Sequence, residues 1–211
     1  MVNNTIIMTE LISAIIANDY SKVNYLISLG VDINEPLPED RLMPPVGYAI
    51  AYSCSDIVDL LIKSGATVEN FLINQLPYLS SLVRIAERSN YEIVNLLILS
   101  GLDINHPLEE GDTILHKSVE KYDVNFIKFL LKLGANPNQI NEYGWTPLMS
   151  LICLQNSSKF QVGEQLNLLD LFWDSTAKIV IQDYDGRNLL EIAEDYPQAH
   201  EKILDYIRER L

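Results

Sequence analysis

Residues 113–138, TILHKSVEKYDVNFIKFLLKLGANPN, contain the pattern that decides the fold. Apolar residues recur there at three- and four-residue steps on either side of Tyr122-Asp123, which predicts two short amphipathic helices joined by a tight turn. Gly134 follows the second helix, where a left-handed cap closes a helix and glycine adopts it without strain. The segment therefore predicts one helix–turn–helix unit that ends in a glycine turn.

The same unit recurs along the chain, which is the signature of a repeat protein. Four glycine turns, in SLGVDIN, KSGATVE, LSGLDIN and KLGANPN, follow one another at spacings of 35, 36 and 33 residues. A Thr, Ser or Pro lies 21 residues before each of these glycines, as expected of a helix start. Two further copies begin in GWTPLMSL and DGRNLLEIA. We therefore predict six copies, which open near residues 9, 44, 80, 113, 146 and 188.

The repeated unit resembles the ankyrin repeat, whose pattern is Thr-Pro-Leu-His-x-Ala, a second helix with Ile-Val-x-Leu-Leu, and Gly-Ala-x-x-Asn. GWTPL at 144–148 matches the opening, and TILH at 113–116 keeps its threonine, leucine and histidine. GANPN at 134–138 matches the end. A period near 34 residues also fits the tetratricopeptide repeat, but the glycine turns and the DIN or NPN triplets favour ankyrin.

The resemblance covers about residues 9–211 and implies an all-α fold: an ankyrin-repeat solenoid of stacked helix-turn-helix units with short hairpin-type fingers. We expect a single domain over 1–211, an insertion at about 155–165 in the polar stretch LQNSSKFQVGE, and a charged C-terminal cap at 188–211. Because a repeat buries its apolar face only against its neighbours, the predicted core includes Leu97, Ile98, Leu115, Leu130, Leu131 and Leu148.

The charge and the hydropathy of the chain limit the classes of partner that it is expected to bind. Among 211 residues, 29 acidic side chains outnumber 15 basic ones, which gives a net charge of −14 with neutral histidines. A surface this negative repels phosphate groups, so neither nucleic acid nor an anionic membrane is an expected partner. We predict no transmembrane segment and no signal peptide. The expected location is the cytoplasm, of the producing cell or of a host.

The sequence contains no recognisable catalytic or metal-binding motif. Three histidines, His106, His116 and His200, show no zinc-ligand spacing with cysteines or carboxylates. The chain has no Gly-x-Ser-x-Gly elbow, phosphate-binding glycine loop or nucleotide fingerprint. We therefore predict no enzyme, no cofactor and no metal. The resemblance assigns His116 to the family's histidine position, where the ring forms hydrogen bonds within the turn.

The resemblance also implies which residues contact a partner, because family members bind on the concave face formed by finger tips and first helices. Aromatic residues at these positions are of interest, since folding does not require them and Tyr, Trp and Arg are enriched in binding hot spots. The predicted partner has apolar pockets flanked by Lys or Arg, and the chain is expected to be monomeric alone. The predicted partner-binding residues are Arg41, Met43, Tyr52, Arg88, Glu109, Glu110, Asp112, Tyr143, Trp145, Tyr184, Arg187 and Tyr196.

These features predict a non-catalytic module that binds one protein partner, as a scaffold, adaptor or effector. The alternative is a stoichiometric inhibitor, such as an immunity protein that neutralises a basic toxin or enzyme, because charge complementarity accelerates capture. A recruiting subunit of an enzyme complex and a nucleic-acid mimic are less favoured by the sequence. The 155–165 insertion is a second candidate contact, since long loops in compact repeats are often functional.

Overall fold

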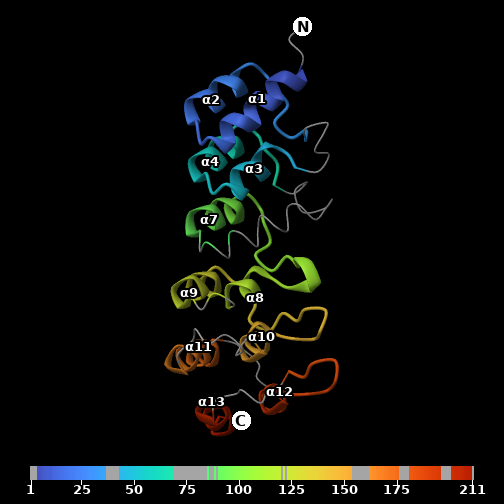
Figure 1. Cartoon of the computed structure of the whole chain (residues 1–211), viewed down its shortest axis with the longest axis vertical. Coiled ribbons are helices and arrows are strands. Elements are labelled where there is room, and N and C mark those ends of the chain that lie inside the picture. The colour runs from blue at the N-terminus through green and yellow to red at the C-terminus, as the bar shows by residue number, and fades with distance from the viewer. Residues whose placement is uncertain are drawn as a thin grey trace. The chain divides into compact units, whose positions relative to one another are not determined.

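The fold is built mainly of α-helices that follow one another in pairs (Figure 1). The computed structural model describes residues 4–36, 43–68, 85, 88, 90–119, 121, 123–153, 162–175, 181–195 and 201–210. The chain falls into two compact units, residues 1–103 and 104–211. Where both helices of a copy are described, a first helix is followed by a second helix, and α2, α4, α7 and α9 end at glycine turns. The extent of the single domain expected over 1–211 stays a prediction.

In the first unit, α1 packs against α3, and α2, α4 and α7 follow one another alongside. Three second helices begin on a capping side chain in the described residues of the two units: Asp19, Asn90 and Asp123 each accept a hydrogen bond from the backbone N–H three residues later. The helices of this unit are α1 (Asn4–Ile16), α2 (Tyr20–Ser28), α3 (Pro45–Ala51), α4 (Ser55–Lys63) and α7 (Tyr91–Leu99).

In the second unit, the first helices α8, α10 and α12 pack on one another, and the second helices α9, α11 and α13 form the other layer. A single 3-10 turn, η1 (Glu109–Gly111), lies in the finger before α8. The helices are α8 (Ile114–Val119), α9 (Val124–Lys132), α10 (Pro147–Cys153), α11 (Val162–Asp174), α12 (Leu189–Asp195) and α13 (Glu201–Arg208).

The predicted openings of the copies coincide with helix starts in four cases. Pro44, Thr113, Thr146 and Asn188 each come directly before a first helix. Asn188 forms a capping box, because its Oδ1 accepts from the Glu191 N–H at 3.1 Å and its own N–H donates to Glu191 Oε2 at 2.7 Å. The predicted opening at residue 80 lies outside the described residues.

Two sequence-based boundaries differ from the structure. Thr9 does not open a helix: α1 begins at Asn4, and the Thr9 hydroxyl donates to the Thr5 carbonyl at 2.8 Å within it. The insertion expected at 155–165 is also shorter at its end, since α11 already begins at Val162. Residues 154–161 lie outside the described residues.

The core is formed by the apolar stripes of both helices of a pair. Leu97, Leu115, Leu130 and Leu148 are buried, as predicted. Ile98 and Leu131 are only partly buried, so their assignment to the core was wrong. Both lie three residues before a closing glycine, on the flank of the second helix rather than on its inward face.

Asparagine side chains connect one repeat to the next. Asn34 Oδ1 accepts from the Thr67 N–H at 2.8 Å, and its Nδ2 donates to the Gly65 carbonyl at 3.1 Å. Asn105 repeats this arrangement, with its Oδ1 accepting from the Asn136 N–H at 2.6 Å and its Nδ2 donating to the Gly134 carbonyl at 3.4 Å. The Asn of the DIN triplet therefore ties its own turn to the following glycine turn in each unit.

His116 connects a finger to the helix layer. Its Nδ1 accepts from the Thr113 N–H at 3.0 Å, so Nδ1 carries no proton, and Nε2 donates to the Trp145 carbonyl at 3.0 Å. The ring is 1% exposed, and this burial lowers the pKa of His116 below that of a free imidazole. His116 therefore forms the hydrogen bonds within the turn that the resemblance implies, as the neutral tautomer with its proton on Nε2.

We predict that Gly144→Ala destabilises the chain by at least about 2 kcal/mol more than Gly134→Ala in urea unfolding followed by circular dichroism. Both glycines have positive φ, +77° and +95°, so both substitutions incur the left-handed cost of about 1–2 kcal/mol. Only at Gly144 does an added Cβ also lie 2.6 Å from the Tyr184 backbone nitrogen, whereas at Gly134 it meets nothing within 4 Å. Equal losses would show that close contact between the fingers is unimportant.

We predict that His116→Gln costs about 1–3 kcal/mol of unfolding free energy at pH 7.5, because buried hydrogen bonds are lost. The cost should be smaller at pH 5.5. The native-state pKa is lowered, so the unfolded wild type takes up the proton first as pH falls below its ordinary value near 6.5, and that part of the stability is lost. Urea titrations of both proteins at the two pH values measure this difference, and an equal cost at both would contradict it.

Candidate interaction surface

Three fingers of the second unit precede its first helices: residues 108–112 before α8, 141–145 before α10, and 183–187 before α12 (Figure 1). Each is a tight hairpin closed by a backbone bond between its end residues. The Asn141 N–H donates to the Trp145 carbonyl at 3.0 Å, and the Asp183 N–H donates to the Arg187 carbonyl at 3.0 Å. The fingers therefore have a fixed backbone on which side chains are displayed.

A short polar side chain holds each of the last two fingers from inside. Asn141 Oδ1 accepts from the N–H groups of Tyr143 and Trp145, both at 3.0 Å. Asp183 Oδ1 accepts from the N–H groups of Asp185 at 3.0 Å and Arg187 at 2.9 Å. Glu142 and Tyr143 in one finger, and Tyr184 and Asp185 in the other, are exposed between the anchor and the hairpin end.

The first two fingers are also joined to each other. The Glu142 N–H donates to the Glu110 carbonyl at 2.8 Å, and Asn141 Nδ2 donates to Asp112 Oδ1 at 2.9 Å. Glu110 itself has a left-handed backbone, with φ of +58°, which non-glycine residues adopt rarely. The two tips are thereby held side by side, because each contributes atoms to the hydrogen bonds of the other.

Two tyrosines at the tips are exposed. Tyr143 is 50% exposed and Tyr184 is 70% exposed. The Tyr143 ring packs on Trp145 with 5.6 Å between ring centroids, and Trp145 is partly buried. The Trp145 ring therefore packs against the Tyr143 ring, and Trp145 itself is only partly accessible to solvent.

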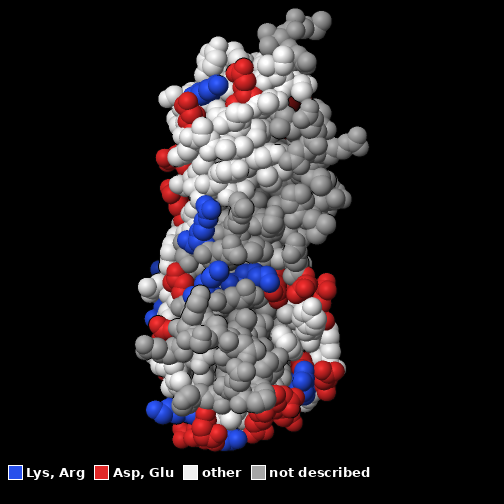
Figure 2. Space-filling view, in the orientation of Figure 1, with Lys and Arg blue, Asp and Glu red and all other residues white. Residues whose placement is uncertain are grey.

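Acidic side chains lie next to these rings. Glu110, Glu142 and Asp185 are exposed, and Glu142 and Asp185 neighbour Tyr143 and Tyr184 in the chain. Figure 2 shows Asp and Glu along the right-hand edge of the view, where Figure 1 places the fingers. We call Glu110, Glu142, Tyr143, Tyr184 and Asp185 the tip residues. Glu142 and Asp185 were missing from the predicted set, although each occupies a contact position of the family pattern.

Two predicted binding residues are engaged within the chain instead. Asp112 is 7% exposed, and its carboxylate binds Lys117 Nζ at 2.7 Å besides Asn141. Arg187 is partly buried, with its guanidinium on Asp183 Oδ2 at 2.7 Å and on Asp195 Oδ2 at 3.1 Å. Burial disfavours the charge of Asp183, but the hydrogen bonds from Arg187 outweigh it and hold the pKa of that carboxyl below its usual range. Both residues stabilise fingers.

The remaining predicted residues are spread over the two units. In the first unit Tyr52 is 47% exposed, Met43 is partly buried, and the exposed Arg88 donates to Ser53 Oγ at 2.8 Å. Glu109 lies in η1. Predicted contacts outside the described residues are Arg41 and Tyr196.

A metal centre and a membrane-spanning helix are two other features that the described residues could contain. Within them, no group of three or more His, Cys, Asp or Glu side chains is placed to hold a metal ion. Nor does any helix in these ranges combine the length and the apolar character needed to cross a bilayer.

A family model for ankyrin repeats in three copies matches residues 82–183. A putative ankyrin repeat protein of Rickettsia felis is 32% identical over 134 residues, which cover 64% of this chain and 45% of that protein. The chain thus spans less than half the length of this relative. A putative ankyrin repeat protein of Acanthamoeba polyphaga mimivirus is 30% identical over 120 residues, which cover 55% of this chain and 69% of the relative.

Among solved structures, the crystal structure of an ankyrin repeat domain from Acinetobacter baumannii is similar, with a TM-score of 0.76 at 20% identity. The match covers 94% of this chain and 96% of that one, and it confirms the predicted fold class. The chain belongs to the ankyrin repeat family, whose domains are in general non-catalytic protein–protein interaction modules.

Proposed function

We propose that the chain binds one protein partner with the tip residues Glu110, Glu142, Tyr143, Tyr184 and Asp185. The observation that carries this proposal is the pair of half- to largely exposed tyrosines on hairpins that are closed by internal hydrogen bonds. Folding gives no reason for an apolar ring at either tip, because the rings lie outside the core. An exposed tyrosine can, in contrast, bury a large area with a partner at a small cost in side-chain entropy.

The rigidity of the fingers supports this role. A binding loop that is ordered before the encounter avoids much of the entropy cost of association. Asn141 and Asp183 fix the backbone on either side of the tyrosines, and the Glu142–Glu110 hydrogen bond fixes neighbouring tips against each other. Trp145 further restricts the ring of Tyr143.

The partner surface that fits these tips carries Lys or Arg beside apolar groups. The carboxylates of Glu110 and Glu142 would attract such cations, and the faces of Tyr143 and Tyr184 could accept them by cation–π contact. Asp185 is exposed, but its carboxylate already lies 3.2 Å from the Arg187 guanidinium. The net charge of −14 would speed the approach of a basic partner at low salt. A basic toxin or enzyme has such a surface, and covering it would make this chain a stoichiometric inhibitor.

Residues of the first unit are proposed as separate contacts, on that unit alone. Tyr52 and Arg88 offer an exposed ring and a guanidinium, and Met43 offers a partly exposed thioether. Arg41 and Tyr196, and the 155–165 insertion, remain proposed contacts from the sequence. Trp145 is proposed to act mainly through Tyr143, whereas Asp112 and Arg187 are left out because their charges are paired within the fingers.

We predict that a photo-crosslinking amino acid at position 143 or 184 captures the partner from cells that produce the chain or are its target. The same amino acid at position 99 is the control, since Leu99 is 83% exposed but lies on the second helix α7. A band seen from 143 and 184 but not from 99 supports the proposal. Capture only from 99 would move the binding surface to the second helices.

We further predict that Tyr143→Ala/Tyr184→Ala weakens binding of the captured partner at least about 100-fold, as expected of hot-spot tyrosines. The matched control is Tyr20→Ala/Leu99→Ala, which also removes two exposed apolar side chains. Calorimetric titration measures both, and thermal melts check that all variants are folded. Equal effects of the two double substitutions would contradict the assignment to the fingers.

A further inference from the structure

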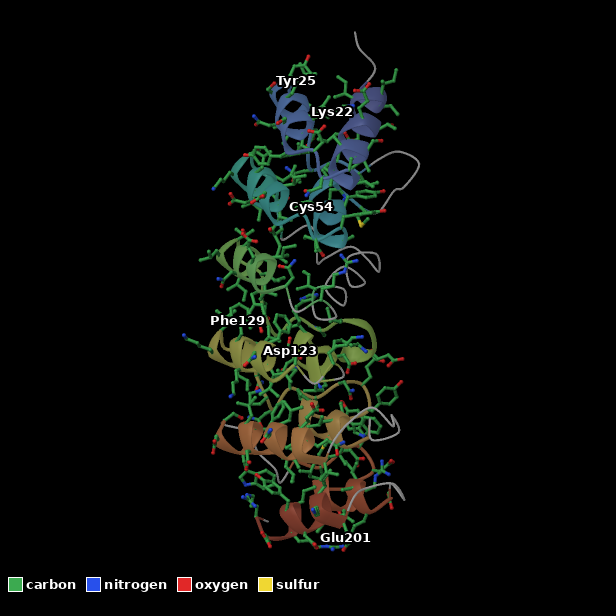
Figure 3. The ribbon with its side chains drawn as sticks, turned by 60° about the vertical axis from the view of Figure 1, so that its left-hand side comes forward. Lys22, Tyr25, Cys54, Asp123, Phe129 and Glu201 are labelled. Carbon is green, nitrogen blue, oxygen red and sulfur yellow. The ribbon has the colours of Figure 1, made fainter. Side chains whose placement is uncertain are left out.

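The three finger tips of the second unit follow one another in a row, with the same contact between neighbours. A Cβ added to Gly111 would lie 2.9 Å from the Glu142 backbone nitrogen, and one added to Gly144 would lie 2.6 Å from the Tyr184 backbone nitrogen. Each glycine therefore lies against the second residue of the next hairpin. Figure 3 shows Phe129, on the second helix α9, on the other side of the unit from the fingers. The row of tips is thus a repeating surface apart from the second helices.

The junction between the first two fingers carries two carboxylates. The Glu142 N–H donates to the Glu110 carbonyl at 2.8 Å, and Glu142 Cγ lies 3.2 Å from the place of an added Cβ on Gly111. Both glutamates are exposed, and neither forms an ion pair with another residue that the structure describes. Like charges on two hydrogen-bonded backbones repel each other, and a Lys or Arg from outside the chain relieves this repulsion. The junction therefore fits one basic side chain.

The junction between the second and third fingers carries two tyrosines instead. Tyr143 directly precedes Gly144, and the missing side chain of that glycine lets the Tyr184 backbone come close. Among the described residues, the Tyr143 ring packs on Trp145 alone and the Tyr184 ring packs on no other ring. Both tyrosines are at least half exposed. The junction therefore offers aromatic faces of the kind on which proline rings pack in peptide-binding proteins.

The two junctions are one finger apart, and this distance favours one conformation of a bound segment. Each finger adds two hydrogen-bonded backbone steps, one within the hairpin and one to its neighbour. Such steps are about 4.8 Å each, so junctions recur about every 10 Å. Residues three apart in a polyproline II helix lie on one side of it and about 9.3 Å from each other. Residues on one side of a β-strand recur about every 6.8 Å and do not match the junctions.

We propose that the partner presents a proline-rich segment in the polyproline II conformation, with a Lys or Arg three residues before or after a proline. The basic side chain binds Glu110 and Glu142, and the proline packs against Tyr143 and Tyr184. A polyproline II segment is already ordered in solution, so it loses little conformational entropy when it binds. This inference rests on the function proposed above and names the part of the partner that the tips contact.

Fluorescence anisotropy of short labelled peptides, titrated with the full chain, tests the segment. One peptide has a single Arg at the centre of a run of prolines, and its control has the same Arg among Gly and Ser, which keeps the charge but not the conformation. We expect the proline peptide to bind at least about tenfold more tightly. Equal affinities, or no binding of the proline peptide up to about 1 mM, would overturn the proposal. Two turns of an α-helix also span about 10.8 Å, so tighter binding of an alanine-based helix with Arg and Leu at that spacing would overturn it as well.

Removal of the two carboxylates locates the basic side chain of the peptide. Glu110→Gln/Glu142→Gln should weaken binding of the proline peptide at least about fivefold, because the Arg loses its charged partners. Glu164→Gln/Asp174→Asn is the matched control, since it removes the same charge from exposed positions of α11 in the same unit. Equal effects of the two double substitutions would show that only the overall charge attracts the peptide, and would overturn the assignment.

Removal of the two rings locates the proline. Tyr143→Ala/Tyr184→Ala should abolish the roughly tenfold preference for the proline peptide over the Gly and Ser peptide, because both peptides keep the Arg contact and neither keeps a ring to pack on. Thermal melts check that this variant is folded. A preference that survives the substitution would overturn the placement of the proline on these tyrosines.

The peptide titrations and the crosslinking experiment can fail separately. A partner that is captured from positions 143 and 184, while the proline peptide does not bind, would leave the proposed function standing and overturn this inference. Capture only from position 99 would contradict both. Mass spectrometry of the crosslinked partner should place the crosslink in a stretch that contains proline and a nearby Lys or Arg.

Discussion

The fold of this chain depends on one constraint: a single helix pair cannot bury its apolar face without a neighbour. The second helices α2, α4 and α7 satisfy it in the first unit, and α9, α11 and α13 satisfy it in the second. The turns that connect them then have to bring the chain back to the same place after each pair. Glycine turns with positive φ and the bridging side chains of Asn34 and Asn105 fix that return. The repeat is therefore held by local turns as much as by the apolar core.

The fingers, too, are held by local hydrogen bonds from a few side chains. One Asn or Asp holds each of the last two hairpins from inside, and the exposed tyrosines next to it lie outside the core. His116 joins the finger system to the helices through the Trp145 carbonyl. In each of these two hairpins the holding residue and the exposed ring are therefore different side chains: Asn141 and Asp183 hold the backbone, and Tyr143 and Tyr184 are the residues proposed to contact a partner.

Much of the fold could be predicted from the sequence, because the signals are local. Helix starts at Pro44, Thr113, Thr146 and Asn188 and the closing glycines are each encoded within a few residues. The site was less predictable. The carboxylate of Asp112 is used by Asn141, 29 residues away, and this contact exists only once two fingers stack. The partial exposure of Ile98 and Leu131 depends on how helix flanks meet, which periodicity alone does not report.

The fingers of residues 104–211 are the proposed partner-binding surface. Hydrogen exchange of the chain, alone and in complex with its crosslinked partner, tests it most directly, because it reports every backbone amide without a substitution. We expect binding to slow exchange in 141–145 and 183–187 while α9 and α11 keep their free-state rates. Slower exchange confined to the second helices, with unchanged fingers, would contradict it.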